Sequence, residues 1–79
     1  MQDNVFSYEM KEHYATLSKV GRYHKELNKV SFCGGNPVYD LRIWIRSGKA
    51  EIPCKGATLT KEEAICLRDA LNSLKELDA

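Results

Sequence analysis

Long apolar runs are missing from this 79-residue sequence, and cysteine is scarce. Because no stretch of about 18 apolar residues occurs and polar residues follow Met1, we expect neither a membrane span nor a signal peptide. We therefore expect a cytoplasmic protein, associated with the nucleoid if its source is bacterial. Cys33, Cys54 and Cys66 are odd in number and widely spaced, with no CxxC pair. Zinc sites have clustered ligands at short spacing, so we expect reduced thiols and no metal.

Motifs of enzyme active sites are missing as well. No glycine-rich phosphate loop or carboxylate pair stands out, and no cysteine has a neighbouring base at a recognisable spacing. We therefore expect a protein that is not an enzyme, uses no cofactor and has no small-molecule substrate.

A strong overall charge is also absent, since the net charge is only +1, but the charges are unevenly distributed. Residues 19–58 contain eight Lys and Arg against three acidic residues, whereas residues 1–18 and 59–79 are each net acidic. The local field rather than the net charge attracts a polyanion, so the middle of the chain is the candidate for binding one. The alternative is that these lysines only discourage edge-to-edge pairing of strands.

The hydrophobic pattern changes once along the chain, from a period of two to the helical period, which predicts the α+β class. Turn residues separate the segments, and Pro53 and Gly56 in the last strand are typical of an edge or bulged strand. We expect one domain over residues 1–79, with a four-stranded antiparallel meander sheet followed by one C-terminal helix (ββββα). The expected strands and helix are Val5–Leu17, Arg22–Cys33, Val38–Arg46, Lys49–Leu59 and Lys61–Leu77.

The C-terminal segment has the features of an amphipathic helix. Thr60 followed three residues later by Glu63 is a capping box. The apolar stripe is wider than one sheet contact needs, and a chain this small is marginally stable alone, so we expect a homodimer through the helices. The expected interface consists of the stripe residues Ala64, Leu67, Leu71 and Leu74.

The third expected strand alternates almost without fault. Tyr39, Leu41, Ile43 and Ile45 have one parity, and Arg42, Trp44 and Arg46 have the other. The apolar parity suits a core, so we expect Trp44 to lie on the solvent-exposed face between two guanidinium groups, rather than in the core. An unpaired nucleic-acid strand suits such a surface, because bases stack on the ring and phosphates contact the cations.

The second expected strand changes parity between Leu27 and Val30, which predicts a bulge near Asn28 and leaves the face of Phe32 open. The four tyrosines are more typical of half-buried packing residues than of ligand contacts, although Tyr14 and Tyr23 are candidates for additional stacking surfaces.

Three segments in this order resemble a known family: KELNKVSF (25–32), PVYDLR with Trp44 (37–44) and KGATLTKEE (55–63). The chain resembles the single-stranded-DNA-binding domain of the transcriptional coactivator positive cofactor four, and more closely its small bacterial YdbC-like branch. The resemblance covers residues from about 8 to 74.

This resemblance implies a ββββα protomer that dimerises through its helices and binds unpaired strands in basic, aromatic-lined channels of the sheet. It implies that Phe32 and Trp44 stack on bases. The phosphate contacts that it implies are Lys25, Lys29, Arg42 and Lys55, and Arg46 joins them because it flanks Trp44 in the strand.

The expected function is sequence-tolerant binding of single-stranded DNA in transcription regulation or DNA maintenance. Two alternatives stay open. An RNA-binding regulator would use the same stacking, and competition between DNA and RNA would distinguish it. A protein-interaction module would use the exposed aromatic face and would lack the strong salt dependence that phosphate contacts produce.

Overall fold

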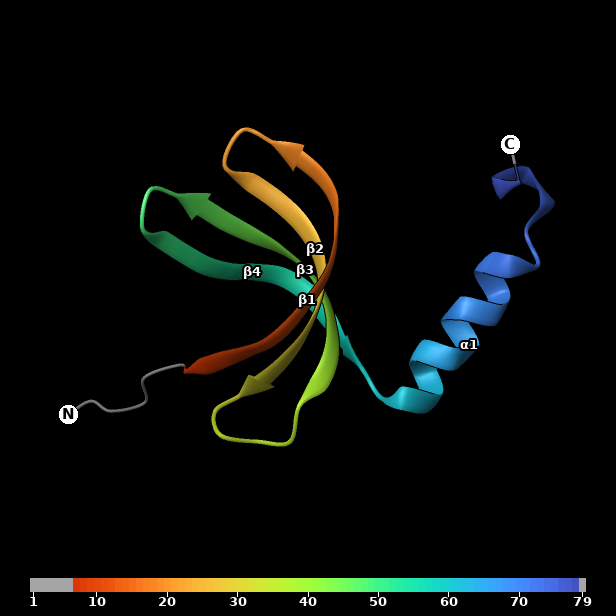
Figure 1. The fold of residues 1–79 in the computed structure, drawn as a ribbon, viewed down its shortest axis with the longest axis horizontal. Helices are drawn as coiled ribbons and strands as arrows, with labels where there is room; N and C mark the ends of the chain where they lie inside the picture. Colours follow the sequence, from red (N-terminus) through yellow and green to blue (C-terminus); the bar gives the residue numbers. More distant parts are fainter. Residues whose placement is uncertain (1–6, 79) are drawn as a thin grey trace.

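The computed structural model of the protein describes residues 7–78, and it contains a four-stranded antiparallel sheet followed by a C-terminal helix (Figure 1). The strands are hydrogen-bonded in sequence order, β1-β2-β3-β4, so the expected ββββα meander is confirmed. The first strand runs three residues beyond its expected end at Leu17, and the expected start at Val5 lies outside the described residues. The elements are β1 (Tyr8–Val20), β2 (Tyr23–Phe32), β3 (Val38–Ser47), β4 (Ala50–Leu59), α1 (Lys61–Asn72) and the short 3₁₀ helix η1 (Lys75–Leu77).

Irregular pairing is confined to the two edge strands. The register between β2 and β3 has no shift from Tyr23 to Val30, so the bulge expected near Asn28 is wrong. Instead, β1 shifts against β2 at three places, each adding one residue to β1, and β4 shifts against β3 opposite Ile43. The bulge expected in the last strand is therefore confirmed. Bulges increase the local twist and bend the strand that carries them, which favours a strongly curved sheet.

The capping box begins α1 as expected. Glu63 N–H donates to Thr60 Oγ1 at 3.1 Å, and Thr60 N–H donates to Glu63 Oε1 at 2.8 Å. The helix ends at Asn72 rather than at the expected Leu77. Ser73 Oγ donates to the carbonyl of Ala70 at 2.7 Å, and after this local contact the chain leaves the α-helical path before η1.

The two faces of the sheet differ in how deeply their side chains are buried. Residues paired directly across antiparallel strands share a face. The face that includes Glu26, Asn28, Val30, Asp40 and Trp44, here called the inner face, holds the most deeply buried side chains. The opposite face, here called the outer face, carries the pairs Leu27–Leu41 and Lys25–Ile43, and these side chains are half-buried or exposed.

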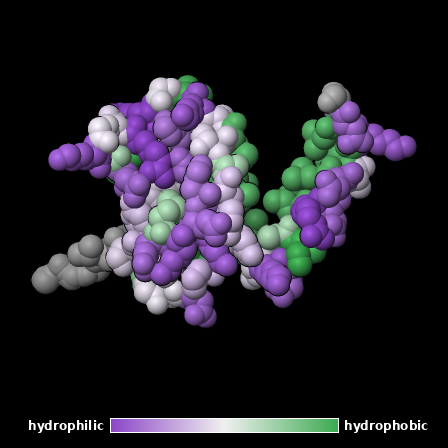
Figure 2. Space-filling model, viewed as in Figure 1, coloured by the Kyte–Doolittle hydropathy of each residue, from purple (hydrophilic) through white to green (hydrophobic). Residues whose placement is uncertain are grey.

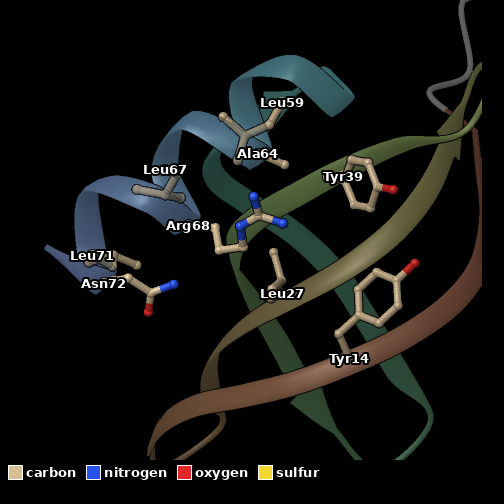
Figure 3. Close-up of a pocket in the computed structure, with 9 residues that line it drawn as sticks. All are labelled: Tyr14, Leu27, Tyr39, Leu59, Ala64, Leu67, Arg68, Leu71 and Asn72. Atoms are coloured by element: carbon tan, nitrogen blue, oxygen red, sulfur yellow. The ribbon is translucent and has the colours of Figure 1, made fainter.

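Helix α1 stands apart from the sheet on its outer side (Figure 1). Hydrophobic residues lie on both sides of the gap between helix and sheet (Figure 2). The gap is a groove of about 580 Å³ lined from the sheet by Tyr14, Leu27, Tyr39 and Leu59 and from α1 by Ala64, Leu67, Arg68, Leu71 and Asn72 (Figure 3). Within residues 7–78, no helix has the length and apolar character that a membrane crossing requires.

Candidate nucleic-acid interface

A chain of charged hydrogen bonds crosses the inner face. Arg46 donates two hydrogen bonds to the Glu26 carboxylate, at 2.7 and 2.9 Å, and a third to Glu51 at 2.6 Å. The Tyr8 hydroxyl donates to Glu51 Oε1 at 2.6 Å and also lies 3.0 Å from the Glu51 carbonyl. Tyr8 and Glu51 belong to the two edge strands, so the inner face is concave enough for opposite edges to meet.

The same chain of hydrogen bonds continues into β1. Asn28 Nδ2 donates to Glu26 Oε1 at 3.1 Å, which leaves Asn28 Oδ1 facing His13 Nδ1 at 2.6 Å. Because that oxygen can only accept, Nδ1 carries the proton, and His13 Nε2 lies 3.2 Å from Thr16 Oγ1. All four strands therefore contribute to one polar network, defined here as Tyr8, His13, Thr16, Glu26, Asn28, Arg46 and Glu51.

The network changes the acidity of its members. Hydrogen bonds from Arg46 lower the pKa of Glu26 from 4.5 to about 2, and hydrogen bonds from Tyr8 and Arg46 lower the pKa of Glu51. Burial and the adjacent Glu51 carboxylate raise the pKa of Tyr8 from 10.0 to about 12. The carboxylates are therefore held in their charged form and the phenol in its neutral form.

The expected exposure of Trp44 is wrong, because its side chain is 0% exposed. The Tyr8 ring contacts it edge-on with centroids 5.1 Å apart, and the Arg46 guanidinium lies 5.1 Å from the ring centroid. Val30, which is also fully buried, shares this face. The concave inner face thus encloses its own side chains, and Trp44 offers no free ring surface in this structure.

The two arginines expected to contact phosphates are paired with carboxylates. Arg42 Nε lies 2.7 and 2.8 Å from the two oxygens of the buried Asp40 carboxylate, and Arg42 Nη2 lies 2.7 Å from Asp40 Oδ2. Arg42 Nη1 donates to the Cys54 carbonyl at 2.9 Å. Arg46 is held by Glu26 and Glu51 as described above. Carboxylates of the protein largely neutralise the charge of both arginines. Their attraction for a polyanion is therefore weaker than the sequence pattern suggested.

The three expected lysines lie elsewhere. Lys25 pairs with Ile43 and Lys29 with Tyr39, which places both on the outer face. Lys25 and Lys55 line one hollow whose floor includes Leu41 and Ile43. Neither of these two lysines has an acidic partner within residues 7–78. The Lys29 ammonium lies 5.4 Å from the Tyr39 ring centroid.

Aromatic side chains divide between the faces. Phe32 is half-buried, and the Arg42 guanidinium lies 5.0 Å from its ring centroid. On the outer face, Tyr23 is 46% exposed beside Lys25, with which it lines a shallow hollow. Tyr14 stacks on Tyr39 at 6.2 Å, next to the groove. Tyr23 is therefore an exposed aromatic beside Lys25, a cation without an acidic partner within residues 7–78.

The expected interface stripe of α1 is accessible in the single chain. No residue of α1 is buried, and Leu67 and Leu71 are 39% and 45% exposed. Leu74 is 41% exposed but lies beyond the end of α1, so it is not part of the helical stripe as expected. Ala64 is half-buried and lines the groove together with Leu67 and Leu71. One helix and one sheet therefore leave this apolar surface partly uncovered.

Sequence reasoning missed the acidic partners Glu26, Asp40 and Glu51. A signal was present, since Asp40 shares the parity of Arg42 two residues away in the same strand. Within the described part of the chain, no group of three or more His, Cys, Asp and Glu side chains is arranged to hold a metal ion.

The fold and this surface define a small ββββα protein with a polar network on one sheet face and, on the other, lysines that have no acidic partner in the described part of the chain. No protein-family model matches the chain. It is 40% identical over 70 residues to an uncharacterized protein of Treponema pallidum (strain Nichols), an alignment that covers 87% of this chain and 80% of that protein. The chain therefore belongs to the same family as the Treponema protein.

Proposed function

We propose that the protein binds single-stranded DNA as a homodimer, with little dependence on base sequence, in transcription regulation or DNA maintenance in the cytoplasm. The observation that carries this proposal is the hollow on the outer face. There Lys25 and Lys55 line one hollow together with Leu41 and Ile43, and neither lysine has a carboxylate partner within residues 7–78. Tyr23 is exposed beside Lys25. Cations next to an accessible aromatic and apolar surface suit phosphates and unstacked bases together.

The contact set that we propose is narrower than the sequence pattern suggested. Lys25, Lys29 and Lys55 contact phosphates, and Tyr23 provides a stacking surface, with Phe32 at the edge of the inner face as a second. Arg42 and Arg46 are left out because their carboxylate partners already use their charge. The family resemblance of the KELNKVSF and KGATLTKEE segments supports the same ligand class.

The open groove supports the homodimer that we propose. A second copy of α1 would place its own apolar stripe against the leucines that the single chain leaves exposed, including Leu67 and Leu71. Burying apolar surface in this way contributes roughly 25 cal/mol per Å². Lys25 and Lys55 line a separate hollow that shares no lining residue with the groove, so this hollow would stay available to the nucleic acid.

The test is a titration of labelled oligo-dT, duplex DNA and RNA of equal length at several salt concentrations. We expect oligo-dT to bind more tightly than duplex. Three phosphate contacts predict a log–log salt slope near −2, from about −0.7 per contact on single strands. Lys25→Ala and Lys55→Ala should each make the slope shallower by about 0.7, whereas Lys75→Ala, on η1, should leave it unchanged.

The outcomes separate the alternatives. Equal affinity for duplex and single strands, or a flat salt response, contradicts the proposal and favours a protein-interaction module. Tighter binding of RNA than of oligo-dT favours an RNA-binding regulator.

A further inference from the structure

An apolar row crosses the outer face near the β1–β2 and β3–β4 turns, which lie at the same end of the sheet (Figure 1). The row takes one directly paired residue from each strand: Val20, Tyr23, Ile45 and Ile52. Directly paired side chains share a face, and Tyr23 has the parity of Lys25, so the whole row lies on the outer face. Val20, Tyr23 and Ile52 are 71%, 46% and 49% exposed. Single exposed apolar residues are ordinary, whereas a contiguous row marks a contact surface.

The hairpin turns beside this row carry only positive charge. Residues 17–25 and 43–50 contain no acidic residue, and their cations are Lys19, Arg22, Lys25, Arg46 and Lys49. Arg46 pairs with Glu26 and Glu51, but the other four have no acidic partner within residues 7–78. A second copy placed face to face on the row would bring like charges together. An anionic ligand with apolar parts complements the row instead.

The row is continuous with the hollow that carries the proposed function. Val20 and Tyr23 line a shallow hollow of about 320 Å³ together with Lys25 and Ile43. Lys25 and Ile43 also line the hollow that contains Lys55. Tyr23 and Lys25 are two residues apart on one face of β2, which separates them by about 7 Å along the strand. Cations for phosphates therefore lie one step away from the apolar row.

The cations and the row run in the same direction. Lys25 is on β2 and Lys55 is on β4, so the line between them crosses β3. The apolar row also crosses the strands, from β1 to β4. A ligand with a line of phosphates on one side and a line of bases on the other would lie across the β-strands and contact both.

The side chains of the row indicate which base it suits. Tyr23 supplies the one aromatic ring, and the other three members are aliphatic. An aliphatic side chain offers no ring for stacking, but it makes a good apolar contact with the C5-methyl group of thymine.

We propose that this apolar row is the base-contacting part of the DNA interface and that it favours thymine. The bound strand crosses the β-strands, with phosphates near Lys25 and Lys55, one base on Tyr23, and thymine methyl groups against Val20 and Ile52. The proposal rests on the proposed function and adds to it the direction of the strand and a modest preference among bases. Burial of one methyl group changes affinity by only about fourfold, so binding stays tolerant of sequence.

The experiment compares oligo-dT with oligo-dU of the same length. The two have the same sugar and phosphates and differ only in the C5-methyl group, and the comparison on the wild-type protein needs no substitution. We expect wild type to bind oligo-dT about 4- to 10-fold more tightly than oligo-dU.

Val20→Thr and Ile52→Thr test the two ends of the row, on opposite edge strands. Both changes keep a β-branched side chain at an exposed strand position, so the sheet should stay folded, which the urea midpoint checks. Each should lower oligo-dT affinity by about 2- to 4-fold and oligo-dU affinity less, without changing the salt slope. Ile65→Thr is the matched control, since Ile65 is 39% exposed on α1 and lines neither hollow. It should match wild type with both oligonucleotides.

The results that would overturn the proposal are distinguishable. If wild type binds both oligonucleotides equally, the thymine preference is wrong and the proposed function stands. If Val20→Thr lowers the dT-to-dU ratio and Ile52→Thr does not, the strand does not cross to β4. If both variants keep wild-type affinities but have a lower mass in light scattering, the row is an interface between copies. If wild type binds neither oligonucleotide at any salt concentration, the proposed function fails, and this proposal with it.

Discussion

Gly56 shows how a single residue sets the spacing of two strands. A Cβ atom at this position would lie 1.9 Å from Arg42 Cβ and 2.5 Å from Arg42 Cα. Gly56 pairs with Arg42 next to the register shift between β3 and β4. The close approach holds Arg42 where it reaches both Asp40 and the Cys54 carbonyl.

We predict that Gly56→Ala lowers the free energy of unfolding by at least about 2 kcal/mol, since the backbone of β3 must move to admit the methyl group. Gly21→Ala is the control, because Gly21 has φ +59 and a methyl group added there would meet nothing within 4 Å. It should lose only about 1 kcal/mol, from backbone strain. Equal losses in the two variants, measured by urea denaturation, would contradict the steric explanation.

Cys33 adopts a backbone conformation that suits another residue better. It has φ 51 in the turn between β2 and β3 and precedes Gly34 with φ 75. Gly35 N–H donates to the Phe32 carbonyl at 2.9 Å and closes the turn. Two successive positive φ values at a hairpin favour Asn-Gly.

We predict that Cys33→Asn raises the free energy of unfolding by about 0.5–1 kcal/mol, because asparagine tolerates the left-handed region better than cysteine. Cys66→Asn is the matched control on exposed α1, where the two residues have similar helix propensity. The denaturant midpoint should rise for the first variant and stay near wild type for the second. A midpoint that falls for Cys33→Asn would show that the thiol stabilises the turn.

At the scale of the elements, the polar network holds the four strands together, which is the role of an apolar core in other small sheets. It connects all four strands, and Glu26 at its centre is 3% exposed. Removing one partner of a buried ion pair leaves an uncompensated charge, which costs about 3–5 kcal/mol. The stability of the folded sheet therefore depends on these groups staying charged.

This dependence predicts loss of stability in acid. The pKa of Glu26 is about 2 in the folded protein against 4.5 ordinarily, so the folded state favours the carboxylate. The contribution is complete above pH 4.5 and is lost as the pH falls from 4.5 to about 2. Its size is on the order of 3 kcal/mol.

Melting temperatures measured from about pH 6 to pH 2 test this prediction. Glu26→Gln should be less stable than wild type near neutral pH and should lose less stability below pH 4.5. Glu12→Gln, an exposed acid without an ion pair in the described part of the chain, should retain the wild-type acid response. A Glu26→Gln curve parallel to wild type would show that another group controls the acid transition.

At the scale of the whole molecule, the separation of the helix from the sheet is the feature that matters most for assembly. The groove has apolar walls from both, and residues of α1 stay exposed (Figure 3). The single chain thus has less core than its apolar residues could provide, and association is one way to bury the remainder.

We predict that Leu71→Asp converts a dimer into monomers or unfolded chains, because it places a charge where an apolar contact is needed. Light scattering at about tens of micromolar checks the mass, a concentration at which a stable dimer is populated. Cys66→Asp, on α1 but outside the groove lining, should remain dimeric. A monomeric wild type would contradict the homodimer directly.

The sequence alone determined the order of the elements and several of their boundaries. Alternation over 38–46 predicted β3, and the Thr60–Glu63 capping box predicted the start of α1 at Lys61. Pro53 and Gly56 predicted the irregular edge strand. These features depend on neighbours close in sequence, so local rules were sufficient.

Only the tertiary structure decided which face of the sheet is enclosed. Alternation separates Trp44 and the arginines from Leu41 and Ile43, but it does not say which set the curved sheet surrounds. Curvature arises from bulges in β1 and from contacts such as Tyr8–Glu51, between residues 43 positions apart. A polar face became the core because its charges pair across strands, and such long-range pairing has no local sequence signature.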